Sequence, residues 1–332
     1  MAAEQDRLLG ESPAFLQILE EVSQAAPLEK PVLIVGERGT GKELIAARLH
    51  FLSNRWEGQF LKMNCAAISD SLLESELFGH EAGAFTGATR THHGRFERAH
   101  GGTLFLDELA TTSALVQEKL LRVIEYGEFE RVGGTKTLHC DVRLVAATNE
   151  DLPTRAEEGK FRYDLLDRLA FDVLTLPPLR EREEDILLLA RHFAITMATE
   201  LGREYFAGFG SAARDALMTH PWPGNVRELK NVVERCVYRS HPDEEVEEVV
   251  FDPFDSPYRP ASQPSPPQGS TPAGNYDLPL DLKQTVRELE IDLINRALEN
   301  SKHNQRKAAD LLKLTYHQLR GYLKKYELLK SD

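Results

Sequence analysis

Cysteine is scarce in this chain of 332 residues, and its few copies are scattered. Cys65, Cys140 and Cys236 lie far apart and form no closely spaced pair, which argues against a disulfide framework or a cysteine metal site. This usage suits a reducing compartment. We expect all three to be small, buried apolar residues.

Long apolar runs are also missing. No run of about 18 apolar residues occurs, so no membrane-spanning helix is expected. The N-terminal residues MAAEQDRLLGESPAF lack the basic start and apolar run of a secretory signal. The sequence therefore predicts a soluble, cytoplasmic protein.

Positive charge is in deficit, with 40 Lys and Arg against 53 Asp and Glu and a formal net charge of -13. This balance excludes a protein that coats nucleic acid with its whole surface, so any DNA contact must come from a local basic patch. The length allows two or three domains, each with its own core.

The first part of the chain alternates short apolar runs with helical periods, the pattern of a parallel sheet wrapped by helices. This predicts an α/β subdomain over residues 1–175. The strands are expected at Val32–Val35, Phe60–Asn64, Thr103–Leu106, Val142–Ala147 and Phe171–Leu176.

Three further segments follow. Strand signals vanish from Glu183 to Arg239, where apolar residues recur at helical spacing, so we predict a helical lid subdomain over 176–245. Residues 246–281 are predicted to be an acidic, proline-rich linker, because Asp252 to Asp281 contains eight prolines. Apolar periodicity beyond it predicts three helices in a small all-α domain over 282–330.

A glycine-rich loop follows the first predicted strand and opens a predicted helix. It comprises Gly36, Glu37, Arg38, Gly39, Thr40, Gly41 and Lys42. This is the context of a phosphate-binding loop, in which backbone N–H groups and the helix N-terminus face the phosphates and the lysine reaches the outer ones. The alternative is an ordinary glycine turn. Glu43 stands where such loops usually carry a magnesium-binding Ser or Thr, so Thr40 or water would complete the metal shell.

Two adjacent carboxylates end the third predicted strand, in the sequence GGTLFLDE. Asp107 can orient a Mg²⁺-bound water, and Glu108 can polarise the water that attacks the terminal phosphoryl group. The alternative is a pair of solvated loop residues. Together with the phosphate loop, the pair predicts nucleotide hydrolysis rather than binding alone.

Residues 76–88 carry the sequence ELFGHEA followed by GAFTGA. On composition alone this is a flexible loop with one exposed Phe, suited to an unspecified partner. With the phosphate loop in the form GERGTGKE, it resembles the bacterial enhancer-binding proteins, the AAA+ activators of sigma-54 RNA polymerase, in which Glu43 is normal. The resemblance covers nearly the whole chain. It implies an AAA+ P-loop NTPase fold with an α-helical lid, followed by a Fis-like helix-turn-helix domain.

The resemblance also assigns roles within the loops. The residues implied to contact sigma-54 are Gly83, Ala84, Phe85, Thr86, Gly87 and Ala88. Asn64 is similar to a switch residue that hydrogen-bonds Glu108, although an Asn at a strand end is more often a turn former. The segment Arg131–Gly134 resembles a second loop that moves with the first.

Further residues of the nucleotide site are implied in the same way. Thr148 and Asn149 match a sensor of the terminal phosphate, and Arg227, in WPGNVREL, matches a second sensor over the same phosphates. The wall of the adenine pocket is expected at Leu8, Leu9 and Gly10. ATP as the nucleotide is thus implied by the resemblance.

The segment FRYDLLDRL resembles the one that holds the family's trans-acting arginines. A guanidinium inserted from a neighbouring subunit can raise the rate of phosphoryl transfer by ~10³ to 10⁵, so hydrolysis would require a ring, a hexamer in this family. If this segment is helical, Arg162 and Arg168 lie on different faces, which predicts different roles, and we expect Arg168 to be the direct finger. The alternative for either is an ion pair with Asp164 or Asp167.

Basic residues gather near the C-terminus, where residues 301–326 carry a local charge of +6. Two short predicted helices with a tight turn between them indicate a helix-turn-helix whose second helix enters a major groove. Lys313 occupies the turn, where a glycine is usual, at a cost of about 1 kcal/mol. The residues predicted to bind DNA are Thr315, Tyr316, His317, Gln318, Arg320 and Lys324. The alternative is a solvated face of a dimerising hairpin.

Only about 30 residues precede the first strand, too few for a phosphoacceptor or ligand-sensing domain. Control is therefore expected from a separate protein in trans. Within the family the chain is most similar to activators of the phage shock response, which implies an inhibitor resembling phage shock protein A. Trp56 is predicted to be an exposed anchor for that inhibitor. The alternative is a buried Trp.

Together these features predict a sigma-54-dependent transcriptional activator. A hexameric ATPase that uses ATP and Mg²⁺ would remodel the closed complex of sigma-54 RNA polymerase into the open complex, tethered to enhancer DNA. Two alternatives stay open: a nucleotide-switched DNA-binding regulator without mechanical remodelling, and the same motor with another client, as in helicase loaders or protein unfoldases.

Overall fold

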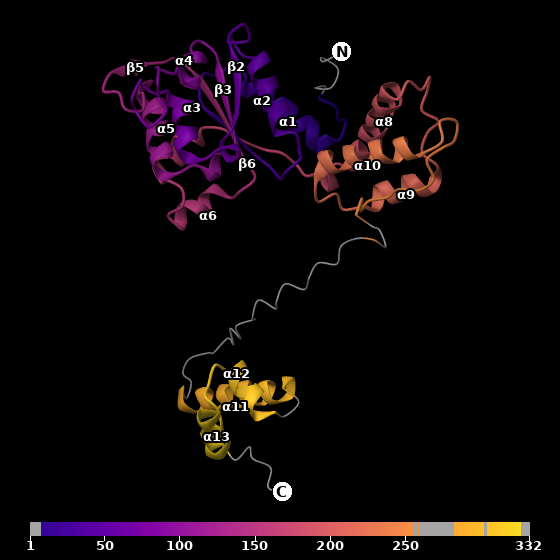
Figure 1. Cartoon of the computed structure of the whole chain (residues 1–332). Coiled ribbons are helices and arrows are strands. Elements are labelled where there is room, and N and C mark those ends of the chain that lie inside the picture. Colours follow the sequence, from indigo (N-terminus) through magenta and orange to yellow (C-terminus); the bar gives the residue numbers. More distant parts are fainter. Residues whose placement is uncertain (1–7, 255–257, 259–281, 302–303, 327–332) are drawn as a thin grey trace. The chain divides into compact units, whose positions relative to one another are not determined.

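The structure, a computed structural model, describes residues 8–254, 258, 282–301 and 304–326. The chain divides into two units, Met1–Pro253 and Phe254–Asp332 (Figure 1). Most of the proline-rich tether predicted within Asp252–Asp281 lies outside the described residues.

Five parallel strands form the central sheet of the first unit, in the order β2-β3-β6-β1-β7 (Figure 1). Their bounds are β1 Val32–Val35, β2 Phe60–Asn64, β3 Thr103–Asp107, β6 Arg143–Thr148 and β7 Val173–Thr175. All five predicted strands are confirmed, the last in a shorter form. Because the strands are parallel, their carboxyl ends meet at one edge of the sheet, where such folds bind ligands.

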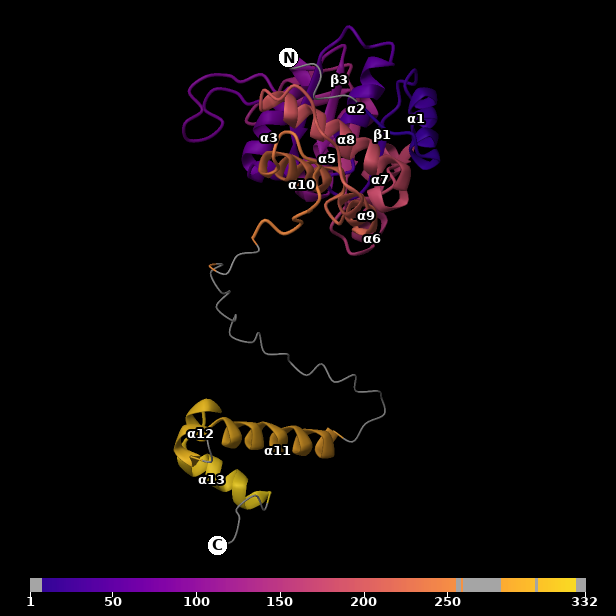
Figure 2. The same ribbon diagram turned by 90° about the vertical axis from the view of Figure 1, so that its right-hand side faces the viewer.

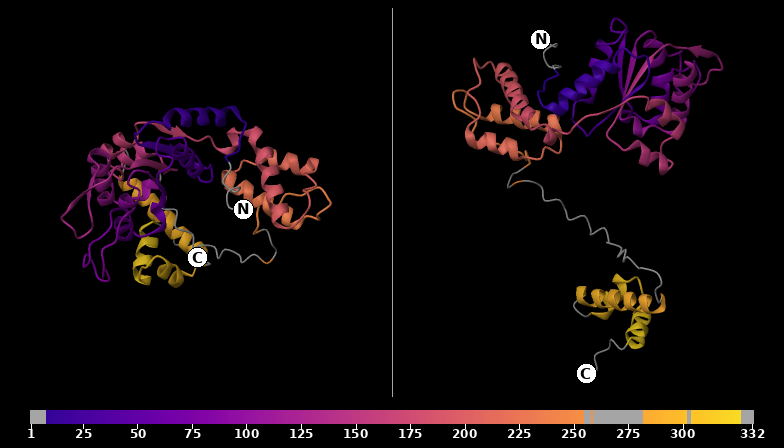
Figure 3. Two further views of the ribbon diagram at one scale, coloured as in Figure 1. Left: turned by 90° about the horizontal axis from the view of Figure 1, so that it is seen from above. Right: turned by 180° about the vertical axis from the view of Figure 1, so that it is seen from behind.

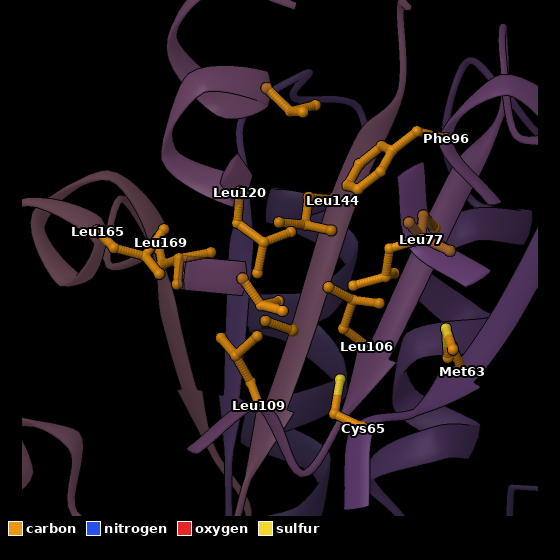
Figure 4. Packing of buried hydrophobic residues seen from close by; sticks show 14 of the residues in the cluster. Met63, Cys65, Leu77, Phe96, Leu106, Leu109, Leu120, Leu144, Leu165 and Leu169 are labelled. Atoms are coloured by element: carbon orange, nitrogen blue, oxygen red, sulfur yellow. The ribbon is translucent and has the colours of Figure 1, made fainter. Parts of the chain in front are cut away.

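Both faces of the sheet are apolar because helices cover both. Successive β3 residues alternate, with Leu104 and Leu106 in one buried cluster and Phe105 in the other. The first face packs on α3 (Asp70–Phe78), α5 (Ala114–Tyr126) and α7 (Tyr163–Leu169). Figure 4 shows Leu120 of α5 beside Leu144 of β6 in this layer. The second face packs on α1 (Pro13–Ala25) and α2 (Lys42–Phe51).

A short antiparallel hairpin, β4 (Glu128–Glu130) and β5 (Thr137–His139), projects from this core and was not predicted. The remaining short elements of the α/β part are η1 (Cys65–Ala67), α4 (Arg95–Arg98), η2 (Leu109–Thr111) and α6 (Leu152–Glu157).

The predicted helical lid is present, and Figure 3 shows it as a separate helical layer beside the α/β part. It comprises η3 (Leu179–Glu181), α8 (Glu183–Glu200), α9 (Ser211–Thr219) and α10 (Asn225–Arg239). Its core surrounds the fully buried Trp222, whose indole N–H donates to the carbonyl of Leu217 at 2.9 Å.

The linker begins later than the predicted residue 246. Val246 is buried in the lid core and forms a bridge with Phe209, and Val249 and Phe251 pack against the same cluster. The acidic composition of residues 243–248 hid these apolar contacts, because Val246 is a single buried side chain between exposed glutamates.

The second unit consists of the three predicted helices, α11 (Leu282–Asn300), α12 (Gln305–Leu311) and α13 (Tyr316–Lys325). Figure 2 shows α12 and α13 grouped toward the C-terminal end of α11. Their shared core includes Ile294, Ala308, Leu319 and Leu323. The arrangement provides the helix, turn and helix expected of a DNA-binding module.

No helix in the part of the chain that the structure describes is long and apolar enough to cross a membrane. The expectation for the cysteines is confirmed, since Cys65, Cys140 and Cys236 are all buried and unbonded.

The turn between α12 and α13 supplies a stability prediction. Lys313 has a φ of 54°, the left-handed conformation in which a side chain is unfavourable. We expect Lys313→Gly to stabilise the C-terminal unit by about 0.5–1 kcal/mol, measured by urea denaturation of the full chain. Lys313→Ala controls for loss of the charge while keeping the Cβ. Equal stabilities of the two variants would contradict the strain.

Candidate functional site

The predicted phosphate loop connects β1 to α2 and is closed by its own lysine. Lys42 Nζ donates to the carbonyl oxygens of Gly36 at 2.8 Å and Glu37 at 3.1 Å. Gly39 and Gly41 have φ values of 79° and 99°, so the turn requires glycine at both positions. The loop therefore holds a buried ammonium group at the N-terminus of a helix, where an anion is favoured.

The two predicted carboxylates face this lysine. Burial lowers the pKa of Lys42, and the charges of Asp107 and Glu108 oppose that shift. Asp107 Oδ1 accepts a hydrogen bond from the N–H of Glu108 at 3.0 Å, and Arg38 Nε lies 3.9 Å from Glu108 Oε1. Glu108 has a φ of 54°, a conformation that costs free energy for a residue with a side chain. Such strain is typical of groups held in place for function.

Asn64 ends β2 directly beside Asp107 of β3 in the strand register. Its side-chain oxygen accepts from the N–H of Ala66 at 2.9 Å. Within the described residues no hydrogen bond joins Asn64 to Glu108, so the bond implied by the family resemblance is not made in this conformation. The neighbouring position suits the predicted switch, which stays a prediction.

Thr148 and Asn149 lie at the end of β6, next to the phosphate loop. The carbonyl of Thr148 accepts from the N–H of Gly36 at 3.1 Å, and its hydroxyl accepts from the N–H of Glu150 at 3.0 Å. The Asn149 Oδ1 atom is buried, with no hydrogen-bond partner in the described part of the chain. Such an atom is available to a further polar group at this edge.

A cleft of about 550 Å³ opens between the sheet and the lid. Of the predicted residues it is lined by Leu8, Leu9, Arg38, Gly39, Thr40, Gly41, Lys42, Glu43, Asp107, Glu108 and Arg227. The lining residues that were not predicted include Phe15, Arg182, Leu189, His192 and Phe193. Gly36, Glu37, Gly10, Asn64, Thr148 and Asn149 are not among the described residues that line it.

Gly10 has a packing role near this cleft. A Cβ added at Gly10 would lie 2.3 Å from the ring of Phe15, so the missing side chain lets this ring approach. Arg182 stacks over the same ring, with its guanidinium carbon 3.8 Å from the centroid. Phe15 and Arg182 are both buried in this contact, so Gly10 helps to form a packed wall at this end of the cleft.

Neither predicted arginine finger belongs to the described lining of the chain's own cleft. Arg162 precedes α7 and pairs with Asp164, with 2.7 Å between Nη2 and Oδ2. Arg168 Nε donates to Glu125 Oε1 of α5 at 2.8 Å, a partner that was not predicted. The Arg162–Asp164 pair is the ion pair weighed as the alternative, so each arginine has a resting partner that another anion would have to replace.

Gln117 of α5 links the segment after Glu108 to Arg162, and sequence reasoning missed it. This buried side chain donates to the carbonyl of Thr112 at 2.8 Å and accepts from the N–H of Arg162 at 2.9 Å. No short motif marks such a residue. Only the fold reveals that the two segments share one buried amide.

The predicted sigma-54 loop is a compact turn with an exposed tip. The N–H of Gly83 donates to the carbonyl of Ala88 at 2.7 Å, and that of Ala88 to Phe85 at 3.0 Å. Phe85 is 44% exposed, and its ring lies edge-on to His80 with 4.9 Å between centroids. Thr86 is exposed beside it. The structure thus places Phe85 and Thr86 where a partner can reach them.

Arg131 connects this loop to the β4–β5 hairpin. Its guanidinium donates to Glu81 Oε1 at 2.7 Å, to Glu97 Oε1 at 2.9 Å and to Glu97 Oε2 at 2.6 Å. A Cβ added at Gly133 would lie 2.7 Å from the Cβ of Ala84, so the two loops are in direct contact. The predicted pairing of the loops therefore has a physical basis in a shared arginine.

Trp56 is 58% exposed, which decides against the alternative of a buried Trp. Its loop is anchored by the neighbouring Arg55, which donates to Asp141 Oδ1 at 2.7 Å and to Glu29 Oε2 at 2.5 Å. The indole therefore stands on a fixed loop.

In the second unit, Thr315 caps α13 as predicted, accepting from the N–H of Gln318 at 3.3 Å. His317, Arg320 and Lys324 are exposed along α13, and Tyr316 is half-buried. Gln318 is exposed too, but its Oε1 accepts from the N–H of Thr315 at 2.9 Å. A Gln318 contact with a base through that oxygen would have to open this capping box.

These two units match known families. The family described as "Sigma-54 interaction domain" matches residues 8–175, "AAA+ ATPase lid domain" matches 180–263, and "Bacterial regulatory protein, Fis family" matches 285–326. The chain belongs to the sigma-54-dependent transcriptional activators, which join an AAA+ nucleotide-binding domain to a helix-turn-helix DNA-binding domain.

Within this class, the chain is 58% identical over 333 residues to the Psp operon transcriptional activator of Escherichia coli (strain K12), covering 99% of this chain and 100% of that protein. It is 41% identical to the regulatory protein AtoC of the same organism, over 98% of this chain and 68% of that protein. Among solved structures, NtrX from Brucella abortus in complex with ATP is similar, with a TM-score of 0.67 and 32% identity over 96% of this chain and 69% of that chain. The ADP complex of NtrX gives a TM-score of 0.69 at 32% identity, over 98% and 71%.

The bridge that Arg131 forms between Glu81 and Glu97, here called the Arg131 clamp, can be tested by mutation. Arg131→Ala removes the guanidinium that bridges the carboxylates of Glu81 and Glu97, so we expect faster amide hydrogen exchange across residues 79–92. Mass spectrometry of the exchanged full chain measures this. Arg122→Ala, which removes an exposed pair with Glu118 on α5, is the control. Unchanged protection in Arg131→Ala would contradict the clamp.

The stabilisation that the Arg131 clamp provides depends on pH. Burial of Glu97 opposes ionisation, but hydrogen bonds from Arg131 and His93 outweigh it and lower the pKa of Glu97 to about 2. The folded pKa is thus below the ordinary value of 4.5, so the stabilisation is complete above pH 4.5 and is lost as the pH falls toward 2.

Proposed function

We propose that this activator hydrolyses ATP in a hexameric ring and uses the reaction to remodel the closed complex of sigma-54 RNA polymerase into the open complex. The proposal rests on one observation: the residues of the nucleotide cleft and the two predicted arginine fingers lie on different parts of the subunit. Lys42, Asp107 and Glu108 share one cleft, whereas Arg162 and Arg168 lie outside its described lining. A complete site then needs a second copy of the chain.

The groups of the cleft suit phosphoryl transfer. On ATP binding, the Lys42 ammonium group exchanges its two carbonyl partners for phosphate oxygens, while the loop N–H groups hold the β-phosphate side. The Glu108 carboxylate accepts a hydrogen bond from the attacking water and polarises this water toward the terminal phosphorus. Arg227 of the lid lines the same cleft. The buried Asn149 oxygen, directly after β6, would accept a hydrogen bond from the attacking water. The ATP and ADP complexes of NtrX support nucleotide as the ligand.

The residues present fit Mg²⁺ bound mainly through the nucleotide. The described residues contain no group of three or more His, Cys, Asp or Glu that could hold a metal by itself. Mg²⁺ usually binds through one or two carboxylates, phosphate oxygens and water, and it neutralises charge on the phosphates. Asp107 would hold it here. The Thr40 hydroxyl donates to the Glu37 carbonyl at 2.9 Å, and its oxygen retains a lone pair for the metal.

The trans-acting arginines complete the site in a ring. Arg168 would exchange Glu125 for the terminal phosphate of the neighbouring subunit, and Arg162 would exchange Asp164. Exposed ion pairs of this type contribute little stability, so little free energy is lost when either pair opens. The buried Gln117 keeps the Arg162 backbone in register with the segment after Glu108.

The output of the cycle is movement of the Phe85 loop against sigma-54. Asn64 ends β2 beside Asp107 and would pass the state of the carboxylates to this loop. Arg131 couples the loop to the β4–β5 hairpin. The exposed basic residues of α13 would hold enhancer DNA, which keeps the activator near the promoter. We place this activity in the cytoplasm.

Control in trans is the remaining part of the proposal. The similar Escherichia coli protein is named as the activator of the psp operon, which supports a role in the phage shock response. Trp56, exposed on a loop anchored by Arg55, offers an inhibitor resembling phage shock protein A a rigid aromatic anchor.

Glu108→Gln distinguishes this motor from a nucleotide-switched regulator. The variant keeps the size of the side chain but removes the base, so ATP turnover should fall by about 10² or more while ATP binding persists. Phosphate release and equilibrium binding of a fluorescent ATP analogue measure the two properties. A motor then loses activation of transcription. Full activation by Glu108→Gln would favour the switch instead.

Thr86→Ala tests the client. Removal of this exposed hydroxyl at the loop tip should abolish retention of sigma-54 by the nucleotide-bound ring, whereas ATP turnover without polymerase should continue. Co-sedimentation of sigma-54 with the ring measures retention. Thr89→Ala, which removes an exposed hydroxyl just outside the predicted contact residues, is the matched control. Normal sigma-54 retention by Thr86→Ala would point to another client.

Trp56→Ala tests the inhibitor surface. Loss of a central aromatic anchor typically costs 2 kcal/mol or more of binding free energy, so inhibition should require about 30-fold more inhibitor. Titration of ATP turnover with the purified inhibitor measures this. Phe51→Ala, which truncates another exposed aromatic residue at the end of α2, is the matched control. An unchanged titration curve for Trp56→Ala would dispose of the assignment.

A further inference from the structure

The phosphate loop is tied to the lid by side chains that the proposed reaction does not use. Glu37, the second residue of the loop, accepts two hydrogen bonds from Arg180, with 2.7 Å from Nη2 to Oε1 and 3.0 Å from Nη1 to Oε2. It accepts a third from Asn225 Nδ2 at 3.0 Å. Arg180 lies in η3 and Asn225 begins α10, so one carboxylate holds two separate parts of the lid.

Both the nitrogen and the oxygen of the Asn225 side-chain amide form hydrogen bonds. Its Nδ2 also donates to the carbonyl of Arg38 at 3.0 Å, and its Oδ1 accepts from the N–H of Leu179 at 2.8 Å. The residue is 0% exposed and has a φ of 52°, a conformation that Asn tolerates better than most residues. A buried Asn with all its bonds made has one orientation, so it sets the start of α10 relative to the loop.

Backbone packing brings the same two segments together. A Cβ added at Gly39 would lie 2.3 Å from the carbonyl oxygen of Gly224, the residue that precedes α10. Arg227, two residues after Asn225 in α10, lines the nucleotide cleft. The position of Arg227 over the phosphates therefore depends on how α10 sits on the loop.

The Glu37 carboxylate is charged under all physiological conditions. Hydrogen bonds from Arg180, and next from Asn225, lower the pKa of Glu37 to about 2. Both members of the ion pair are about half exposed, with 45% for Arg180 and 42% for Glu37. When this ion pair opens, both charged groups are therefore solvated by water and neither is left buried without a partner.

We propose that Glu37, Arg180 and Asn225 form a latch that fixes the lid on the phosphate loop and thereby positions Arg227 over the bound nucleotide. The inference rests on the proposed nucleotide function of the cleft. Glu37 and Arg180 are positioning residues, because they act through the lid. A phosphate that rearranges the loop moves Glu37, and the latch passes that movement to α10.

Arg180→Gln tests the latch in the full chain. It breaks the bidentate contact but leaves the phosphate loop sequence unchanged. We expect release of a fluorescent ADP analogue to become about two- to fivefold faster, the scale of a partly exposed ion pair. Arg180→Lys, which keeps the charge and one hydrogen bond, should restore part of the difference. Arg203→Gln is the control, because Arg203 bonds to Ser240 within the lid.

Coupling to Arg227 separates positioning from general stability. If the latch positions Arg227, the effect of Arg227→Gln on ADP release should be smaller in the Arg180→Gln background than in the unaltered chain. A purely structural role predicts that the two effects add. Additive effects, or a release rate for Arg180→Gln equal to that of the unaltered chain, would overturn the proposal.

Lid position can be measured without nucleotide. Spin labels at Lys30→Cys and Glu204→Cys, two exposed sites on the α/β part and the lid, report the distance between them. The native cysteines can remain, because they are buried and burial raises the pKa of the Cys65 and Cys140 thiols to about 12. Arg180→Gln should broaden the distance distribution, and Arg203→Gln should not. An identical distance distribution in Arg180→Gln would contradict the latch. Failure of the unaltered chain to bind ADP would instead reject the proposed function, and it would leave this distance measurement valid.

Discussion

The ammonium group of Lys42 is held by two carbonyl oxygens of its own loop, at the carboxyl edge of a parallel sheet that also ends in Asp107 and Glu108. Nearly every other feature of the first unit follows from keeping these groups together. The sheet must be parallel so that β1 and β3 end at one edge, and both its faces must be apolar because helices cover both. A parallel sheet needs crossover connections, and one of these carries the Phe85 loop.

Two loops of the first unit are tied to neighbouring segments chiefly by polar contacts. Arg131 joins the Phe85 loop to the β4–β5 hairpin through Glu81 and Glu97. Glu37 joins the phosphate loop to the lid through Arg180 and Asn225. Partly exposed ionic contacts can exchange partners at low cost, whereas a packed core cannot. A machine that moves loops and lid around a fixed sheet is therefore expected to place such contacts at the moving joints.

The elements that could be predicted from the sequence are those set by local patterns. The five sheet strands follow from apolar runs, the lid helices from helical spacing, and the phosphate loop from glycine spacing in its strand and helix context. The GAFTGA segment was assigned by resemblance, and its exposed Phe85 fits that assignment. The left-handed Lys313 followed from the need for a tight turn.

Residues that act through distant partners could not be predicted. Asn225 contacts Glu37 across 188 positions, and Gln117 contacts Arg162 across 45. Their identities are ordinary on a helix, so only the fold shows that they are buried and fully bonded. The start of the linker was predicted too early for a related reason, since Val246 is a lone apolar residue in an acidic segment that nevertheless packs on the lid.

The central claim is that hydrolysis at the Lys42 cleft is converted into movement of the Phe85 loop against sigma-54 RNA polymerase. Open-complex formation tests it most directly, with the purified full chain, sigma-54 RNA polymerase and promoter DNA probed for melted bases. The account predicts melting with ATP and none with a non-hydrolysable analogue that binds equally well. Equal melting with the two nucleotides would contradict it.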